Sequence, residues 1–153
     1  MSEQPGDEFQ TAFWNAKRTL AEASENAYRR HGVHAGQQFI LLELWREDGQ
    51  TPGGLARRLG LATPTVTKMT SRMEAAGLLE RGPHPSDRRL VRIHLTERGR
   101  VLQEVMTEEM QQVTERALGS LGPEDRARLV GLLVQVHRNL ATSSGEAVAA
   151  AHT

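Results

Sequence analysis

Apolar residues near the start of the chain recur at alternating steps of four and three positions, as they do along one face of an α-helix. They are Phe9, Phe13, Ala16, Leu20, Ala23 and Ala27. The stripe is narrow, and charged or polar residues flank it, which is typical of a helix that pairs with another helix. We therefore expect a helix from Asp7 to about Arg30 whose apolar stripe packs against a helical partner.

The segment 31–36 interrupts this period, and a stretch rich in apolar residues follows from about Ala35 to Arg46. The density of apolar residues indicates a second helix that lies in the hydrophobic core. The residues expected there are Phe39, Ile40, Leu41, Leu42, Leu44 and Trp45.

Two short helices are predicted next, because each of two segments begins with threonine and proline and ends with glycine. Threonine caps a helix N-terminus, proline suits the first turn and glycine suits the C-terminal cap. The segments run from Thr51-Pro52 to Gly60 and from Thr63-Pro64 to Gly77. The inward face of the second helix is formed by Val66, Met69, Thr70 and Met73.

A turn-rich cluster at residues 82–87 precedes alternating apolar and polar residues, which predicts a β-hairpin with one buried face. Val91, Ile93 and Leu95 are expected on that face. Thr96 then caps a long helix, and residues 119–122 break it. The last helix begins at Pro123, and its apolar side carries Leu129, Leu132, Leu133, Val136 and Leu140.

The predicted fold class is therefore mainly α with a small β-hairpin wing. Its order of helix, turn, helix and hairpin is that of a winged helix-turn-helix, which we place at residues 35–96 between long helical segments at 7–34 and 97–141. Residues 1–6 and 142–153 are expected to be mobile tails. At 153 residues the chain has the length of about one domain.

Composition excludes several classes of protein. The chain is 38% hydrophobic and 25% charged, as an ordinary globular domain is. It has no apolar stretch of the roughly 18 to 20 residues that spans a bilayer, and its acidic start is unlike a signal peptide, so we expect a cytoplasmic protein without membrane contact. Cysteine is absent, which removes disulfides, thiolate nucleophiles and thiolate metal ligands.

The net charge of zero hides a segregation of charge along the chain. Residues 1–50 carry five Lys and Arg against eight Asp and Glu, residues 51–100 carry ten against four, and residues 101–153 carry four against seven. A basic middle between acidic ends indicates that the middle of the chain faces a polyanion.

The second short helix supplies suitable chemistry for entering a DNA major groove. Its periodicity places hydroxyls and cations on the outward surface, where hydroxyls can bond phosphates or base edges and cations can pair with phosphates or guanine. The candidate DNA-binding residues of this helix are Thr63, Pro64, Thr65, Thr67, Lys68, Ser71 and Arg72.

The hairpin tip carries further candidates. Arg88, Arg89 and Arg92 lie on or just after it, and an arginine on a protruding loop can enter a minor groove, where negative potential is concentrated. Asp87 is placed to hold such a guanidinium in a fork-shaped ion pair. The wing candidates are therefore Asp87, Arg88 and Arg89.

These segments resemble the MarR family of bacterial regulators. The matching residues are Leu55-Ala56 to Gly60, Thr63 to Thr67, Glu74 to Arg81, Asp87-Arg88-Arg89, and Leu95-Thr96 to Gly99. The resemblance implies a homodimer built by the helical segments 7–34 and 97–141, with a recognition helix in each of two major grooves and Arg89, supported by Asp87, in a minor groove. The dimer contacts expected from it are Phe9, Phe13, Leu20, Leu129, Leu133 and Val136.

The resemblance also implies a function. It points to a transcriptional repressor that binds an inverted-repeat operator in double-stranded DNA and releases it when a small phenolic or anionic ligand binds. No motif assigns the ligand-binding residues. Trp14, Arg18, His34 and Trp45 are candidates for lining such a site, and each is also explained as a packing or surface residue.

Other functions find less support in the residues. His31 and His34 would need a third ligand to bind zinc, and His84, Ser86 and Asp87 lack the nucleophile elbow and oxyanion donors of a hydrolase. We expect no enzyme, no metal and no cofactor. The rival interpretation is a helical module that binds an acidic protein partner through the same basic surface.

Overall fold

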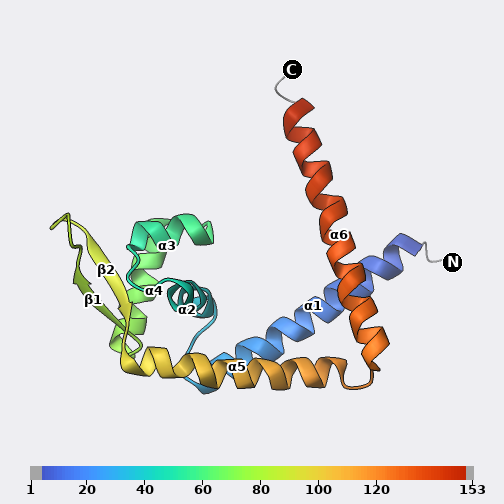
Figure 1. The fold of residues 1–153 in the computed structure, drawn as a ribbon, viewed down its shortest axis with the longest axis horizontal. Coiled ribbons are helices and arrows are strands. Elements are labelled where there is room, and N and C mark those ends of the chain that lie inside the picture. The colour runs from blue at the N-terminus through green and yellow to red at the C-terminus, as the bar shows by residue number, and fades with distance from the viewer. Residues whose placement is uncertain (1–4, 151–153) are drawn as a thin grey trace. The chain divides into compact units, whose positions relative to one another are not determined.

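The computed structural model describes the backbone of residues 5–150 and the side chains of residues 7–141. The chain divides into two compact units after Val113. Its elements are α1 (Pro5–Arg30), α2 (Gln37–Arg46), α3 (Pro52–Leu59), α4 (Thr63–Ala75), β1 (Leu79–Pro83), β2 (Val91–Leu95), α5 (Glu97–Leu118) and α6 (Pro123–Ala150) (Figure 1). The predicted fold class, mainly α with one hairpin, is confirmed. We refer to residues 37–95, from α2 to β2, as the winged domain.

The expected tails fall partly on helices. Residues 5–6 belong to α1 and residues 142–150 belong to α6, so their backbone is helical. Residues 1–4 and 151–153 lie outside the described residues. None of the helices in the described part of the chain has the length and hydropathy that crossing a bilayer requires.

The ends of the two short helices α3 and α4 lie close to the positions that their threonine, proline and glycine residues predict. The Thr51 hydroxyl accepts a hydrogen bond from the Gly54 N–H at 3.0 Å, which caps α3. The prediction that Thr63 caps α4 is wrong: Ala62 holds the cap position without a side-chain bond, and Thr63 is the first helical residue. After α4, Gly77 adopts a φ of 76°, the left-handed conformation that glycine adopts without strain.

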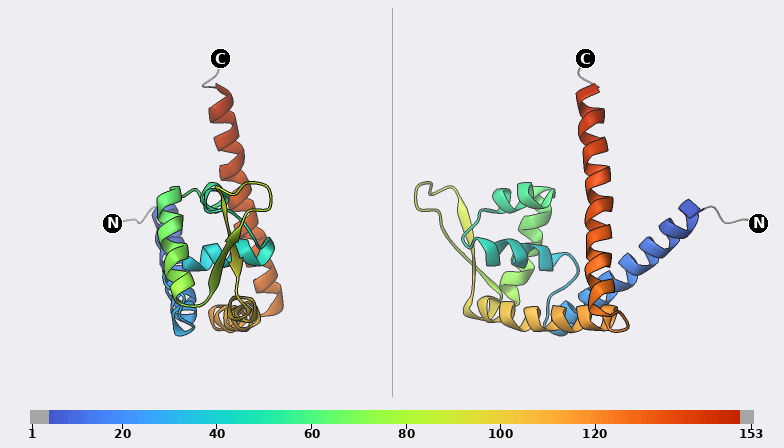
Figure 2. Two further views of the ribbon diagram at one scale, coloured as in Figure 1. Left: turned by 90° about the vertical axis from the view of Figure 1, so that its left-hand side faces the viewer. Right: turned by 45° about the vertical axis from the view of Figure 1, so that its right-hand side comes forward.

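The hairpin pairs β1 and β2 antiparallel, from Leu79 opposite Leu95 to Pro83 opposite Val91. Ile93 and Leu95 are buried as expected. Val91 is 38% exposed, which corrects its assignment to the buried face, because Val91 lies near the tip, beyond the helices that cover the base. Figure 1 and Figure 2 show the hairpin base beside the start of α5 and its tip at the far end.

The hydrophobic core lies where α2, α3, α4 and the hairpin meet the start of α5. Its largest fully buried side chains include Ile40, Leu41, Leu44, Leu55, Met73 and Ile93. Two residues of α2 were expected in the core and are exposed, Phe39 at 52% and Leu42 at 44%. They lie on the side of α2 opposite the buried positions, because a helix in a small domain turns only one side to the core.

Gly99 allows α5 to approach the turn before β1. A Cβ at this position would lie 2.3 Å from the Leu78 carbonyl oxygen, which no side chain tolerates. The Gly99 carbonyl also accepts a hydrogen bond from the Trp45 indole N–H at 2.9 Å. The glycine of the Leu95-Thr96 to Gly99 motif thus has a packing role that joins α5 to the winged domain.

Candidate nucleic-acid interface

The outward surface of α4 carries the candidate residues expected there. Val66, Thr70 and Met73 are buried against the core, and Thr67 is half-buried. The exposed candidates are Thr63, Pro64, Thr65, Lys68, Ser71 and Arg72. The structure therefore gathers hydroxyls and two cations on one exposed side of a helix that is fixed from behind.

One flank of α4 is joined to the hairpin by a residue of the family-matching segment 74–81 for which the sequence predicted no contact. Arg81, on β1, donates from Nη2 to the Ser71 hydroxyl at 2.6 Å and from Nε to a Glu74 carboxylate oxygen at 2.9 Å. The Ser71 hydroxyl itself donates to the Thr67 carbonyl at 2.9 Å. The only local signal in the sequence is that Arg81 lies two residues after buried Leu79, hence on the same side of its strand.

Asp87 and Arg89 form the arrangement predicted for the hairpin tip. One carboxylate oxygen of Asp87 accepts from the Arg89 backbone N–H at 3.0 Å and from its Nε at 3.2 Å. These bonds favour the charged carboxylate and hold the pKa of Asp87 below its ordinary value, the backbone bond being the larger cause. The Arg89 side chain remains 90% exposed, so the pair orients the guanidinium without covering it.

The loop that carries these arginines is held by His84. Its Nδ1 accepts hydrogen bonds from the backbone N–H groups of Ser86, at 3.3 Å, and Asp87, at 3.2 Å. Arg88 is exposed and Arg92, on β2, is half-buried. His84, Ser86 and Asp87, the residue types of a hydrolytic triad, therefore stabilise a turn at the hairpin tip.

The base of the hairpin is fixed to the C-terminal end of α2. The Gln50 carbonyl accepts from the Ile93 N–H at 2.8 Å, and its side-chain amide donates to the carbonyls of Glu43 and Glu47. The Asp48 carboxylate accepts from the Leu95 N–H at 2.9 Å. These two residues were not singled out from the sequence, because their partners on β2 lie more than 40 positions away.

Glu109 joins α5 to the end of α1. Its carboxylate contacts His31 Nε2 at 3.0 Å and also pairs with Arg30. Hydrogen bonding to His31, followed by that to Arg30, holds the pKa of Glu109 below its ordinary value. Within the described residues, no group of three or more His, Asp or Glu is placed to hold a metal ion.

Large apolar side chains lie exposed on α1 and α6. On α1, Phe9 is 48% and Leu20 47% exposed, and Phe13, half-buried, stacks on Phe9 with ring centroids 5.9 Å apart. On α6, Leu129 and Val136 are half-buried and Leu133 is 45% exposed. Further exposed apolar residues of α6 are Val130, Leu132, Val134 and Leu140.

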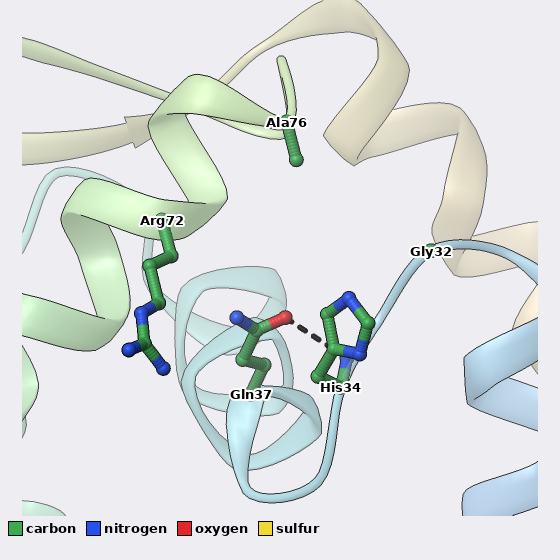
Figure 3. Close-up of a pocket in the computed structure, with 5 residues that line it drawn as sticks. All are labelled: Gly32, His34, Gln37, Arg72 and Ala76. Carbon is green, nitrogen blue, oxygen red and sulfur yellow. Dashed lines mark hydrogen bonds between the residues drawn. The ribbon is translucent and has the colours of Figure 1, made fainter.

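A pocket of about 390 Å³ opens between α4 and the loop before α2. It is lined by Gly32, His34, Gln37, Arg72 and Ala76 (Figure 3). The Gln37 side-chain oxygen accepts from the His34 backbone N–H at 2.9 Å. Among the described residues, neither the Gln37 amide nitrogen nor the Arg72 guanidinium has a hydrogen-bond partner, so both donors are available.

Of the residues considered for a ligand site, His34 alone lines this pocket. Trp45 donates to the Gly99 carbonyl at the core. Trp14 donates to Gln10, and Arg18 pairs with Glu22, both on α1. Gln37 and Arg72 were not considered as a pair, because nothing in their spacing shows that α2 and α4 bring them together.

Comparison with known proteins identifies a family for the chain. The sequence model described as the MarR family matches residues 34–91. The helix-turn-helix-type regulator TtmR of Methylorubrum extorquens is 33% identical over 91 residues, covering 60% of this chain and 47% of TtmR. The helix-turn-helix-type repressor NicR of Pseudomonas putida is 30% identical over 118 residues, covering 70% of this chain and 75% of NicR. The chain spans about half the length of TtmR and of the Bacillus subtilis regulator YsmB.

Solved structures agree with this assignment. A MarR family protein from Bacillus stearothermophilus superposes with a TM-score of 0.75 at 26% identity, covering 92% of this chain and 99% of that one. Reduced AbfR bound to DNA superposes with a TM-score of 0.60 at 27% identity, covering 88% and 92% of the two chains. The resemblance stated from the sequence is confirmed, and with it the expectation of a regulator and not an enzyme. The chain belongs to the MarR family of helix-turn-helix transcriptional regulators.

Proposed function

We propose that this regulator is a homodimeric repressor that binds an inverted-repeat operator and is released from it by a small anionic ligand. The observation that carries the dimer is the exposure of Phe9, Leu20 and Leu133, which a second copy would cover. The relative NicR is a transcriptional repressor, which supports repression as the direction of regulation. The segments that would form the dimer are 7–34 and 97–141, and the segment that would bind DNA is 35–96.

The dimer contacts fall into two sets, one on each outer helix. Phe9, Phe13 and Leu20 form the set on α1, and Leu129, Leu133 and Val136 form the set on α6. Exposed apolar patches larger than a few hundred Å² are rare on monomers and mark interaction sites. Because both sets follow a helical repeat, a helix of a second copy is the partner that fits them.

On DNA, α4 would lie in the major groove and the hairpin tip would follow the backbone to the adjacent minor groove. Thr63, Thr65 and Lys68 are exposed at the front of α4, where hydroxyls and a cation meet phosphates or base edges. Pro64, Thr67 and Arg72 complete the proposed surface of α4, and Ser71 lies on its flank, bonded to Arg81. Asp87 would hold Arg89 for the minor groove, with Arg88 beside it. A two-fold dimer then requires half-sites about one helical turn, 10 to 10.5 base pairs, apart.

The pocket beside α4 is the proposed ligand site. Arg72 and Gln37 offer N–H donors and no acidic side chain lines the pocket among the described residues, so a carboxylate or phenolate is the chemistry that fits. Arg72 also belongs to the proposed DNA surface. A ligand that pairs with Arg72 would therefore withdraw one cation from the DNA and weaken its binding.

The test begins with fragments of the host genome that the wild-type protein retains, sequenced and then synthesised as labelled duplexes. Light scattering should show a dimer in solution, and anisotropy should show tight binding that weakens steeply as salt rises, because neutralised phosphates release counterions. Salicylate, as a simple carboxylate phenol, should weaken that binding for wild type and less so for Gln37→Leu. A monomer in solution would contradict the dimer, and selection of no common sequence would favour the protein-binding alternative.

A further inference from the structure

We infer that Arg81, on the first wing strand, is a positioning residue for DNA recognition that fixes the flank of α4 and neutralises Glu74 beside the DNA surface. The inference rests on DNA binding alone and is independent of the proposed dimer, repression and ligand. It assigns a role to a residue outside the recognition helix and the wing tip.

The contacts of Arg81 form a closed bridge between two elements. Its guanidinium reaches Ser71 with one nitrogen, at 2.6 Å, and Glu74 with another, at 2.9 Å. Ser71 and Glu74 are three positions apart and so lie on the same flank of α4. A planar guanidinium can hold both partners at once, whereas a lysine ammonium offers only one point of charge. The bridge therefore fixes the rotation of α4 relative to β1.

The bridge also determines whether the Ser71 hydroxyl can donate a hydrogen bond to a phosphate. A serine hydroxyl has one proton to donate, and Ser71 gives it to the Thr67 carbonyl at 2.9 Å. Its oxygen already accepts from Arg81. With its proton engaged, Ser71 has none to offer a phosphate oxygen, so in this arrangement its exposed position does not make it a phosphate contact.

Glu74 explains why a cation is needed at this place. Its side chain is 41% exposed on the flank of the helix that meets DNA, where a free carboxylate would repel phosphates. Arg81 is itself 33% exposed and cancels this charge at close range. Removing Arg81 would expose the carboxylate, and removing the carboxylate as well would restore part of the lost affinity.

The test compares Arg81→Ala, Arg81→Lys, Glu74→Gln, Ser71→Ala and the double variant Arg81→Ala with Glu74→Gln, all in the full chain. The probe is a labelled duplex selected from the host genome with the wild-type protein. We expect Arg81→Ala to weaken binding about tenfold, the double variant to recover to within about threefold of wild type, and Ser71→Ala to weaken binding about threefold, because one of the two partners of the bridge is lost. Arg81→Lys should weaken binding severalfold while keeping the salt dependence of wild type, because the charge remains and the bridge is lost.

Several outcomes would overturn the inference. Wild-type affinity in Arg81→Lys would show that charge alone matters, and a tenfold loss in Ser71→Ala would show that its hydroxyl contacts DNA. A loss in Arg81→Ala that Glu74→Gln does not relieve, with a salt slope reduced by about one, would make Arg81 a direct phosphate contact. Thermal unfolding of each variant identifies losses of DNA affinity that come from misfolding. If Arg81→Ala is misfolded, the milder variants Arg81→Lys and Glu74→Gln test the inference.

Discussion

The winged domain and the outer helices α1 and α6 use the same kinds of apolar side chain and leave them in opposite environments. In the winged domain, Leu41 and Leu44 are 0% and 1% exposed. On α6, Leu133 is 45% and Leu140 67% exposed. Both regions show clear helical periodicity in the sequence, so the difference lies in what each stripe has to pack against.

This difference shows which apolar side chains a single chain can bury and which it leaves exposed. Burying a leucine side chain is worth about 1.5 to 3 kcal/mol relative to leaving it exposed. The winged domain gains this within the chain, since α2, α3, α4 and the hairpin enclose a common core. The stripes on α1 and α6 gain it only if another surface covers them, which is why we propose that a second copy of the chain covers them.

The largest expected effect comes from a charge placed on the uncovered stripe. In Leu133→Glu we expect the mass in solution to fall from twice the chain mass of 16.9 kDa to the chain mass, because a carboxylate would be buried without a partner. Affinity for a selected duplex should fall by about 100-fold or more, since the two DNA surfaces no longer bind together. Light scattering and anisotropy measure the two changes.

The control for this variant is Gln135→Glu on the same helix. Gln135 is exposed and lies two positions after Leu133, about 200° around the helix, so it faces away from the stripe. It adds the same charge and should leave the mass unchanged. If both variants remained dimers, the stripe on α6 would not be the interface.

The second effect tests the other side of the comparison. Leu44→Ala should lower the free energy of unfolding by about 2 to 5 kcal/mol, because it leaves a cavity in the core of the winged domain. Denaturant unfolding followed by circular dichroism measures it. The loss should be the same at low and high protein concentration, whereas a loss from Leu140→Ala should depend on concentration, as it does when a dimer interface is weakened. If the loss of stability in Leu140→Ala did not depend on protein concentration, α6 would not differ from the winged domain in needing a second copy.

The sequence predicted the elements of both regions well and the environment of single residues less well. Periodicity located the helices, and the threonine, proline and glycine signals located their ends to within a residue. Phe39, Leu42 and Val91 were expected to be buried and are exposed, because an apolar pattern does not show which side of an element the rest of the chain covers. Thr63 has the right residue type for a cap, but Ala62 takes that position.

For the site residues, contacts between neighbours in the sequence could be predicted and contacts between separate elements could not. Asp87 and Arg89 could be paired from the sequence because they are two positions apart. Arg81 and Glu74 are seven positions apart on a strand and a helix, and Gln37 and Arg72 are 35 apart, so only the fold brings each pair together. Local spacing thus predicts contacts within a turn or a helix, and contacts between elements need the structure.

The third effect separates the surface of the winged domain from its interior. Arg89→Ala should weaken specific DNA binding by about 1 to 3 kcal/mol and change the free energy of unfolding by no more than about 0.5 kcal/mol. This is the reverse of Leu44→Ala, which acts on stability. Anisotropy and denaturant unfolding give the two values. Arg88→Ala serves as the control, since Asp87 does not orient that neighbour, and an equal loss in both variants would remove the specific role of the held guanidinium.

The smallest effect concerns the contact between the end of α1 and Glu109 on α5. The pKa of Glu109 is lowered in the folded protein by hydrogen bonds to His31 and Arg30. A lowered pKa contributes stability that is fully present above the unfolded-state pKa and is lost as the pH falls through the folded-state pKa. Glu109→Gln should therefore lower the unfolding temperature slightly at pH 7, and the difference from wild type should shrink in the acid range below about pH 4.5.

Thermal unfolding of both proteins from pH 7 to pH 3 measures this convergence. Glu108→Gln is the matched control, because Glu108 is exposed and has no ion-pair partner among the described side chains, so its curve should parallel that of wild type. A constant difference between Glu109→Gln and wild type across the whole range would show that the Glu109 charge is not what stabilises this contact. Convergence would instead show that α1 is held to α5 by a titratable contact, in contrast with the apolar core of the winged domain.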